Sequence, residues 1–413
     1  MRFIHAADIH LDSPLRGLGS YEDMPVDIVR GATRAAFTRL VDEALSLEVD
    51  FMVIAGDLYD GDWKDHNTGL YFARQMGRLR AAGIPVYLLH GNHDAESVMT
   101  KRLDLPDNVH VFPARAPATF RLDAHRVALH GRSFPEAAVT DNIAAAYPAP
   151  VPGYFNIGVL HTALEGNARH ANYAPCSLEQ LHASGYQYWA LGHVHEYRVF
   201  PGPVPVVFPG NLQGRHIREP GARGAVLVSA GDDQIASVER LEVDVLRWHE
   251  LRFDVSPHET RGELLAAIGR GLEDVLRQQP DNKPCVLRVV LEGESPLYGE
   301  LQAGRAQLRA DVVARMAGVS DGQLWLEKLR LDIRPPGRKA SGAVSDDVAA
   351  LLAAAVHDPA FHESFLESLQ GLSERASFAL ADEPVFKALR ERQVEGILQE
   401  AAAAVLDRLG REG

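Results

Sequence analysis

The chain has 413 residues, 46% of them hydrophobic and 24% charged, and its formal net charge is −14. This composition excludes a disordered chain, two cysteines exclude a disulfide scaffold, and the acidic balance argues against nonspecific coating of DNA. No apolar run of about eighteen residues and no signal-peptide pattern occur, so we expect a cytoplasmic protein of two or three domains with no membrane contact.

Residues 1–243 alternate strand and helix patterns. Five apolar runs predict buried strands, at residues 3–6, 51–55, 84–89, 157–160 and 189–191. A helix is predicted over 67–82, before the third run. Later strands are predicted at residues 126–130, 198–200, 204–208, 225–229 and 236–241. This mixture predicts an α/β sandwich of two sheets flanked by helices rather than one doubly wound sheet.

The rest of the chain predicts three further segments. Residues 244–334 form a small α+β domain, with strands near 251–255, 285–291 and 329–333 and a helix over 264–275. Residues 335–345 continue a Pro- and Gly-containing stretch that is typical of a linker. Residues 346–413 form a C-terminal helical segment with amphipathic helices at 348–355, 361–369 and 394–405.

Each of the five apolar runs in the first domain ends in groups that bind metals. These groups are, in chain order, Asp8, His10, Asp57, Asn92, His161, His193 and His195. Because the carboxyl ends of parallel strands meet at one edge of a sheet, we expect the seven side chains to converge. Seven such groups suffice for two adjacent divalent ions that share one carboxylate.

A shared-ligand scheme assigns Asp57 to both ions, since a carboxylate has two oxygens and can bind a metal with each. One ion would be held by Asp8, His10, Asp57 and His195, and the other by Asp57, Asn92, His161 and His193. Nitrogen and oxygen ligands without thiolate favour manganese, iron or zinc over calcium. Two metals about 4 Å apart lower the pKa of water to about 7 and clamp phosphoryl oxygens.

The two remaining polar residues of these clusters predict acid–base chemistry. His93 follows Asn92 and is the predicted group that protonates or stabilises the leaving alkoxide. Asp60 lies three residues past Asp57 and is expected to orient that imidazole and raise its pKa. We therefore predict His93 and Asp60 as catalytic residues.

Weaker signals lie near these loops. Arg215, Arg218 and Arg223 form the most basic local stretch, which suits either a phosphate-backbone contact or a solvated loop. Trp63 and Tyr173 suit base stacking or core packing. Three other histidines, His66, His170 and His216, suit support of the ligands or the surface. A helix at 400–409 suits either packing on its own chain or binding a partner helix.

These motifs resemble the calcineurin-like metallophosphoesterase superfamily. Residues 5–12 and 189–195 resemble bacterial SbcD-type DNA repair nucleases, and residues 56–64 and 209–219 resemble the YhaO-like branch. The resemblance implies a four-layer α/β/β/α sandwich followed by a capping domain and C-terminal helices. It also implies a homodimer, DNA as a partner, and docking of those helices on an SbcC-like coiled-coil ATPase.

Three functions fit the sequence. The first is a manganese-dependent DNA exonuclease and endonuclease that acts in double-strand-break repair with an SbcC-like ATPase. The second is a small-molecule phosphoesterase acting on cyclic nucleotides or nucleotide phosphates, which would suit the acidic composition. The third is a non-catalytic subunit that tethers an ATPase to DNA ends, against which the complete ligand set argues.

Overall fold

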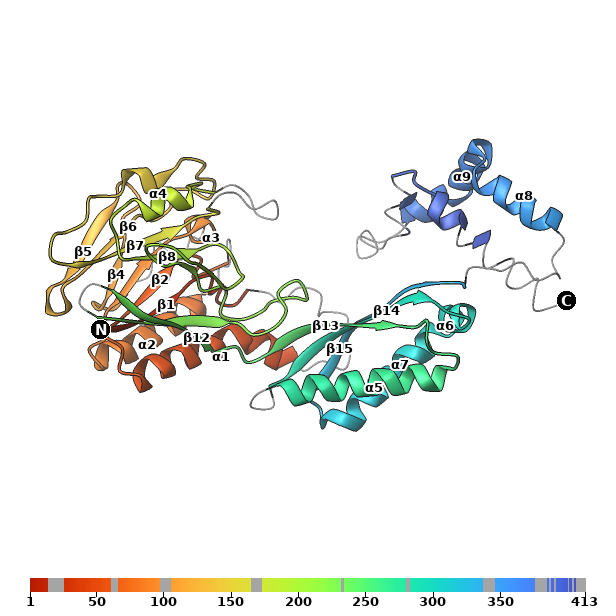
Figure 1. The fold of residues 1–413 in the computed structure, drawn as a ribbon, viewed down its shortest axis with the longest axis horizontal. Helices are drawn as coiled ribbons and strands as arrows, with labels where there is room; N and C mark the ends of the chain where they lie inside the picture. The colour runs from red at the N-terminus through yellow and green to blue at the C-terminus, as the bar shows by residue number, and fades with distance from the viewer. Residues whose placement is uncertain are drawn as a thin grey trace. The chain divides into compact units, whose positions relative to one another are not determined.

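A computed structural model shows the fold (Figure 1). The structure describes residues 1–13, 26–60, 66–96, 105–164, 173–231, 234–279, 283–336 and 346–375, and then 385, 388–389, 391–399, 401–402 and 405. Trp63, His170, most of the predicted linker and most of the predicted 400–409 helix lie outside the described residues. The chain divides into two compact units, one of Met1–Leu251, Leu272–Val289 and Met316–Lys328, the other of Arg252–Gly271, Val290–Arg315 and Leu329–Gly413.

The first unit contains two six-stranded sheets. The first sheet has the order β12-β11-β1-β2-β3-β4, with the strands Ile235–Glu242, Gly224–Ala230, Arg2–Ala6, Phe51–Ala55, Val86–Leu89 and Val109–Val111. The second has the order β5-β6-β7-β8-β10-β9, with the strands Ala118–Leu122, Val127–Gly131, Phe155–His161, Tyr188–Gly192, Val206–Phe208 and Arg198–Phe200. Neighbours from β1 to β4 pair in parallel, as do β6, β7, β8 and β10.

The two sheets face each other across a shared core. In β2, Phe51, Val53 and Ala55 point into the core between the sheets, whereas Met52 and Ile54 pack in the cluster with α1 (Val26–Ser46) and α2 (His66–Ala81). A continuous apolar run is what a strand covered on both faces requires. The second sheet is covered on its outer face by a cluster that includes Leu181 of α4 (Leu178–His182). Figure 1 shows α1 and α2 on one side of the sandwich and α4 on the other, which confirms the predicted α/β sandwich.

Most predicted elements are present, with differences at short or polar segments and at the helix Arg305–Ser320, which was not predicted. β15 (Leu324–Arg334) begins five residues before the predicted start at residue 329. The prediction began too late because Glu327 interrupts the apolar pattern, whereas in the structure Glu327 pairs with Arg288 at 2.6 Å. β4 and β5 were not predicted. β4 is only three residues long, and most of the residues in β4 and β5 are half-buried, so neither has a strong hydrophobic period.

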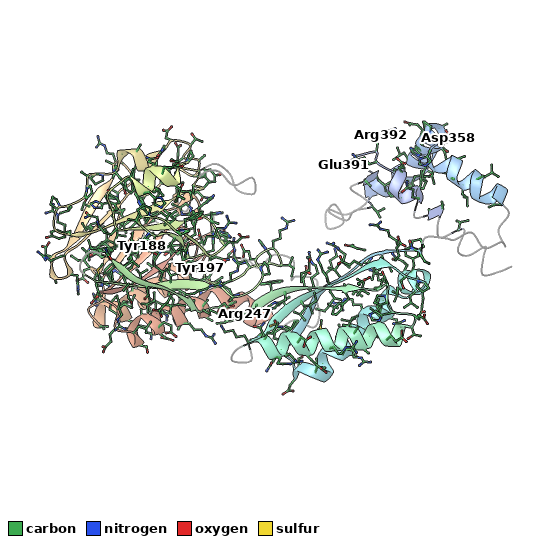
Figure 2. All side chains as sticks on the ribbon, in the orientation of Figure 1. Tyr188, Tyr197, Arg247, Asp358, Glu391 and Arg392 are labelled. Carbon is green, nitrogen blue, oxygen red and sulfur yellow. The ribbon has the colours of Figure 1, made fainter. Side chains whose placement is uncertain are left out.

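A third sheet has the order β13-β14-β15, and its strands contribute residues to both units. β13 is Arg247–Asp254 and β14 is Cys285–Glu294, and Figure 2 labels Arg247 at the start of β13. The helices that follow in this region are α5 (Arg261–Gln278), α6 (Tyr298–Ala303) and α7 (Arg305–Ser320). The domain boundaries after residues 243, 334 and 345 stay predictions.

The predicted C-terminal helices are present in the second unit. α8 (Asp346–Val356) and α9 (Pro359–Arg375) flank Asp358, which Figure 2 labels, and a cluster around Val356, Val394 and Leu398 holds this region together. No helix within the described ranges is long and apolar enough to cross a membrane.

Candidate metal centre

The five predicted strand ends meet because the two sheets face each other. Strands β1, β2 and β3 are parallel, so their carboxyl ends lie at one edge, and parallel β7 and β8 end in the same way in the other sheet. Backbone pairing continues past β1 and β2, since Asp8 N–H donates to Gly56 O and His10 N–H donates to Asp57 O, both at 3.0 Å. The loops that carry the ligands are therefore fixed by the sheet.

Three ligand atoms gather at one side of the site, from Asp8, His10 and His195, which we call the outer group. Nε2 of His10 lies 3.2 Å from Nε2 of His195, and both oxygens of Asp8 accept the backbone N–H of His193 at 3.0 and 3.1 Å. Asp8 and His10 are fully buried, whereas the side chain of His195 is 19% exposed. These side chains offer two nitrogens and a carboxylate to one point.

A second group, the inner group, consists of Asp57, His161 and His193 together with Asn92. Nε2 of His161 lies 3.4 Å from Oδ2 of Asp57 and 3.0 Å from Oδ1 of Asn92. The other ring nitrogen, Nδ1, lies 3.0 Å from the carbonyl oxygen of Ala55, at the end of β2. That contact makes Nδ1 the donor and turns the Nε2 lone pair toward the cluster.

Asp57 of the inner group also faces the outer group through its Oδ2 atom. Oδ2 is 3.4 Å from Nε2 of His161 and 4.0 Å from Nε2 of His10. Oδ1 instead accepts the backbone N–H of His93 at 3.0 Å. Oδ2 is therefore the oxygen that faces imidazoles of both groups, and the predicted bridging role of Asp57 stays a prediction.

Glycines and unusual backbone conformations make this close approach feasible. A Cβ on Gly56 or Gly91 would overlap the His161 ring, and one on Gly192 would overlap the carbonyl of Ala55. Four of the predicted ligand residues have positive φ angles, namely Asp8 at 49°, His10 at 46°, Asp57 at 52° and His193 at 104°. Such conformations cost about 1–3 kcal/mol each and are concentrated at functional sites.

The predicted catalytic pair lies beside these groups. Nδ1 of His93 is 3.1 Å from Oδ1 of Asp60, and that hydrogen bond raises the pKa of His93. The hydroxyl of Ser13 donates to the other oxygen of Asp60 at 2.6 Å. The side chain of His93 is 39% exposed, so it is accessible to a bound molecule. His10, Asp60 and His93 also lie close enough together to form a third set of metal-binding atoms.

The residues present fit divalent cations. Burial raises the pKa of Asp8, so a bound cation would stabilise its ionised carboxylate. Burial lowers the pKa of His10, which favours the neutral imidazole that can bind a metal. Burial also raises the pKa of Asp57, but attraction from His161 outweighs it and the net shift is downward. Nδ1 of His10 is buried without a hydrogen-bond partner among the described residues. Burial lowers the pKa of His161, but attraction by Asp57 outweighs burial and raises that pKa to about 9, so His161 would release its proton on binding a metal. Carboxylates, an amide and imidazole nitrogens form a ligand set for borderline or hard divalent metals.

Comparison with known proteins agrees with this geometry. The calcineurin-like phosphoesterase family profile matches residues 1–197, and the profile of the middle domain of metallophosphoesterase YhaO matches residues 248–334. The uncharacterized metallophosphoesterase YhaO of Bacillus subtilis is 34% identical over 337 residues, which are 80% of this chain and 81% of that protein. The chain belongs to the calcineurin-like metallophosphoesterases. It is a hydrolase acting on phosphoester bonds, in a family that uses divalent metals.

Relatives of this metallophosphoesterase include proteins named for DNA repair. The DNA double-strand break repair protein Mre11 of Methanopyrus kandleri is 27% identical over 91% of this chain and 83% of that protein. A protein of Rhodobacter capsulatus that is named as one subunit of the nuclease SbcCD is 31% identical over 32% of each chain. The predicted superfamily is confirmed, whereas the SbcD-type assignment stays a prediction.

One residue of the metallophosphoesterase site was not predicted. Oε1 of Glu219 lies 2.7 Å from Nδ1 of His195, and its Oε2 accepts from Nδ2 of Asn211 at 3.0 Å and from the Arg215 backbone N–H at 2.8 Å. Burial raises the pKa of Glu219, but the hydrogen bond with His195 and the charge of Arg215 outweigh burial. The net shift of the pKa is downward, so the carboxylate is ionised. Glu219 ends the stretch 209–219 that resembles the YhaO-like branch, but a single glutamate in a charged loop resembles a surface residue, so its contact with His195 was not predicted.

The structure separates the two predicted DNA contacts. The Arg215 side chain is 13% exposed and pairs with Glu219, whereas Arg218 is exposed. Both line a cavity of about 800 Å³ that His195 also lines. Two other residues singled out in the sequence contact residues of the site. The Tyr173 ring packs edge-on against the His193 ring with the centroids 5.5 Å apart, and Nε2 of His216 lies 3.8 Å from Oε1 of Glu219. His66 is the first residue of α2.

Proposed function

We propose that this metallophosphoesterase is a DNA phosphodiesterase that uses two divalent metal ions. The observation that carries the proposal is the position of Asp57 Oδ2, within 4.0 Å of an imidazole nitrogen from each group. The outer ion would be held by Asp8, His10, Asp57 and His195, and the inner ion by Asp57, Asn92, His161 and His193. Manganese is the proposed metal, because the ligands are imidazoles and oxygens without thiolate.

The protein groups divide the chemistry between them. Divalent metals in such a site lower the pKa of water and neutralise charge on phosphoryl oxygens. His93 is proposed to protonate the leaving oxygen, since its ring is partly exposed and its pKa is raised by Asp60. Asp60 would keep that imidazole oriented, and Ser13 would keep Asp60 in place through the 2.6 Å hydrogen bond.

DNA is the proposed substrate on two grounds. First, the relatives that cover most of this chain include proteins named for repair of DNA double-strand breaks. Second, the cavity of about 800 Å³ beside His195 has the volume of sites that bind small-molecule ligands and is large enough for one nucleotide of a strand. Arg218 is exposed on that cavity and is proposed to contact the phosphate backbone. Arg215 was the other predicted contact, and its surroundings support a different role, given below.

We also propose an ATPase partner, a homodimer and a cytoplasmic location. The name of the SbcCD relative describes one subunit of a nuclease, which supports a partner subunit for this chain. Large apolar side chains are exposed on the C-terminal helices, with Leu351 of α8 at 70% and Phe361 of α9 at 45%. An SbcC-like coiled-coil ATPase would cover such side chains in a helix-to-helix contact.

The substrate proposal is tested with purified protein and Mn²⁺ against end-labelled duplex DNA, hairpin DNA, cyclic nucleotides and bis-p-nitrophenyl phosphate. We expect cleavage of DNA and of the small diester, both lost in His93→Ala. Hydrolysis of cyclic nucleotides with intact DNA, even after addition of the ATPase partner, would establish a small-molecule phosphoesterase instead. Binding of DNA and partner with no hydrolysis of any substrate would establish a tethering subunit.

A further inference from the structure

The loop that carries Arg215 is fixed by contacts with residues that belong to neither the inner nor the outer group. Its Gln213 side chain donates to Leu246 O at 2.6 Å and accepts from Val245 N–H at 2.9 Å. The indole N–H of Trp248 donates to Gly214 O at 2.9 Å, and a Cβ on Gly214 would crowd that ring. The position of the Arg215 backbone therefore does not depend on the contacts of the Arg215 side chain.

From this position the guanidinium of Arg215 reaches two carboxylates. Nη2 donates to Oε1 of Glu219 at 3.2 Å, and Nη1 lies 3.8 Å from Oδ2 of Asp60. Nη1 also donates to the Ser13 hydroxyl at 3.4 Å, which itself donates to Asp60. A rigid, permanently charged fork can bind two acceptors in fixed directions, which the single ammonium of lysine cannot do.

Each of the two carboxylates holds one imidazole of the site. Glu219 lies 2.7 Å from Nδ1 of His195 in the outer group, and Asp60 lies 3.1 Å from Nδ1 of His93. Both carboxylates are largely buried, with side chains 6% and 19% exposed. Mostly buried carboxylates need a nearby cation, and one guanidinium serves both.

We propose that Arg215 is a positioning residue that holds the carboxylates of Glu219 and Asp60. It thereby keeps the rings of His195 and His93 in fixed positions relative to each other. The proposal rests on the proposed function of this site. The contacts of the Arg215 guanidinium are with groups of the site: Nη1 donates to Ser13, Nη2 donates to Glu219 and lies 3.4 Å from Nδ1 of His195, and Nε is buried without a hydrogen-bond partner among the described residues. These contacts support a role in positioning the residues of the site, unlike the exposed side chain of Arg218.

The test compares Arg215→Gln and Arg215→Lys with wild type and with the control Arg78→Gln. Arg78 is an arginine on α2 that pairs with Asp42 at 2.6 Å on the surface, so its substitution also removes one arginine–aspartate pair, but far from the site in sequence and contacts. The readouts are kcat and KM for Mn²⁺-dependent hydrolysis of bis-p-nitrophenyl phosphate, and Mn²⁺ binding followed by electron paramagnetic resonance. Circular dichroism verifies that each variant is folded.

For Arg215→Gln we expect kcat to fall roughly 10- to 100-fold with KM within about twofold of wild type, and one of two Mn²⁺ sites to weaken, as when an outer partner of a metal ligand is lost. Arg215→Lys should recover only part of kcat, and Arg78→Gln should match wild type. An unchanged kcat in Arg215→Gln, a rise in KM alone, or full recovery by lysine would overturn the proposal. If wild type hydrolyses no diester, the proposed function fails, while unchanged Mn²⁺ binding in Arg215→Gln would separately overturn the positioning role.

Discussion

The inner and outer groups use the same kinds of ligand but are held by different parts of the protein. In the inner group, the His161 ring is fixed by the backbone carbonyl of Ala55, which belongs to β2. In the outer group, the His195 ring is fixed by the side chain of Glu219, which lies on a loop. His161 is fully buried, whereas the His195 side chain is 19% exposed.

This difference separates what the fold determines from what side chains determine. A backbone carbonyl at the end of a central strand cannot be removed without disrupting the sheet, so the inner group is as rigid as the sandwich. A carboxylate held by an arginine and an asparagine can be altered by single substitutions. We therefore expect the inner site to bind metal more tightly and the outer site to respond to changes in loop 211–219.

The largest effect is expected where the two groups meet. In Asp57→Asn both groups lose the negative charge they share, so we expect loss of about 4 kcal/mol or more of transition-state stabilisation, a decrease in kcat of roughly 10³-fold. Elemental analysis after Mn²⁺ loading should show fewer than two ions per chain. Retention of both ions with near-normal kcat would show that the groups do not depend on a common carboxylate.

The next effect concerns a residue outside both groups. In His93→Ala we expect kcat to fall by about 10²–10⁴-fold, because a positioned proton donor is lost. Mn²⁺ content should stay at the wild-type value, since only the backbone N–H of His93 contacts Asp57. A variant that loses metal together with activity would place His93 among the ligands, in the third set with His10 and Asp60.

A smaller effect distinguishes the groups directly. In Glu219→Ala we expect one Mn²⁺ site to weaken roughly 10- to 100-fold, because the outer imidazole loses its carboxylate partner, while the other site keeps its affinity. Isothermal titration with Mn²⁺ resolves the two events. Glu292→Ala removes an exposed glutamate that pairs with Arg252 and serves as the control. Equal weakening of both sites would contradict the division into backbone-held and side-chain-held groups.

The strand ends and the clustering of the candidate ligands could be predicted from the sequence, because each of these strands is a continuous apolar run that ends at or just before a carboxylate, imidazole or amide. Asp8 and His10 after β1, and His193 and His195 after β8, show this pattern. The pairing order of the sheets could not be predicted, although it decides that β7 and β8 face β2. Long-range pairing leaves no local mark in the chain.

The supporting residues of the site were beyond the reach of sequence patterns. Glu219 and Arg215 look like the solvated charges of a loop, and only the fold reveals that they are mostly buried beside His195. The role of Ser13 beside Asp60 also has no sequence pattern of its own. The same holds for the carbonyl of Ala55, since every residue has a backbone carbonyl. Motif spacing indicates the candidate ligands of a metal and misses the groups that orient them.

The smallest effect concerns the sandwich beneath both groups. His5 of β1 lies 3.1 Å from the hydroxyl of Tyr188, which Figure 2 labels, and 3.0 Å from Leu191 O, and burial lowers the pKa of His5 to about 3. The unfolded chain, with a histidine pKa near 6.5, binds this proton below that pH and the folded chain does not, so stability falls as pH decreases from about 6.5 toward 3.

This residue alone should cost about 2 kcal/mol of unfolding free energy at pH 5 relative to pH 7. Urea unfolding of wild type and His5→Gln at the two pH values measures it. We expect a steeper decrease in wild type than in the variant. Identical decreases would show that His5 of β1 is not held neutral by its contacts with β8.

The central claim is that Asp57 is shared by two metal sites. Anomalous diffraction from a crystal soaked in Mn²⁺ tests it most directly. We expect two peaks about 3.5–4 Å apart, one bounded by Asp8, His10 and His195 and the other by Asn92, His161 and His193, with Asp57 in contact with both. A single peak, or two peaks of which only one lies against Asp57, would contradict the account.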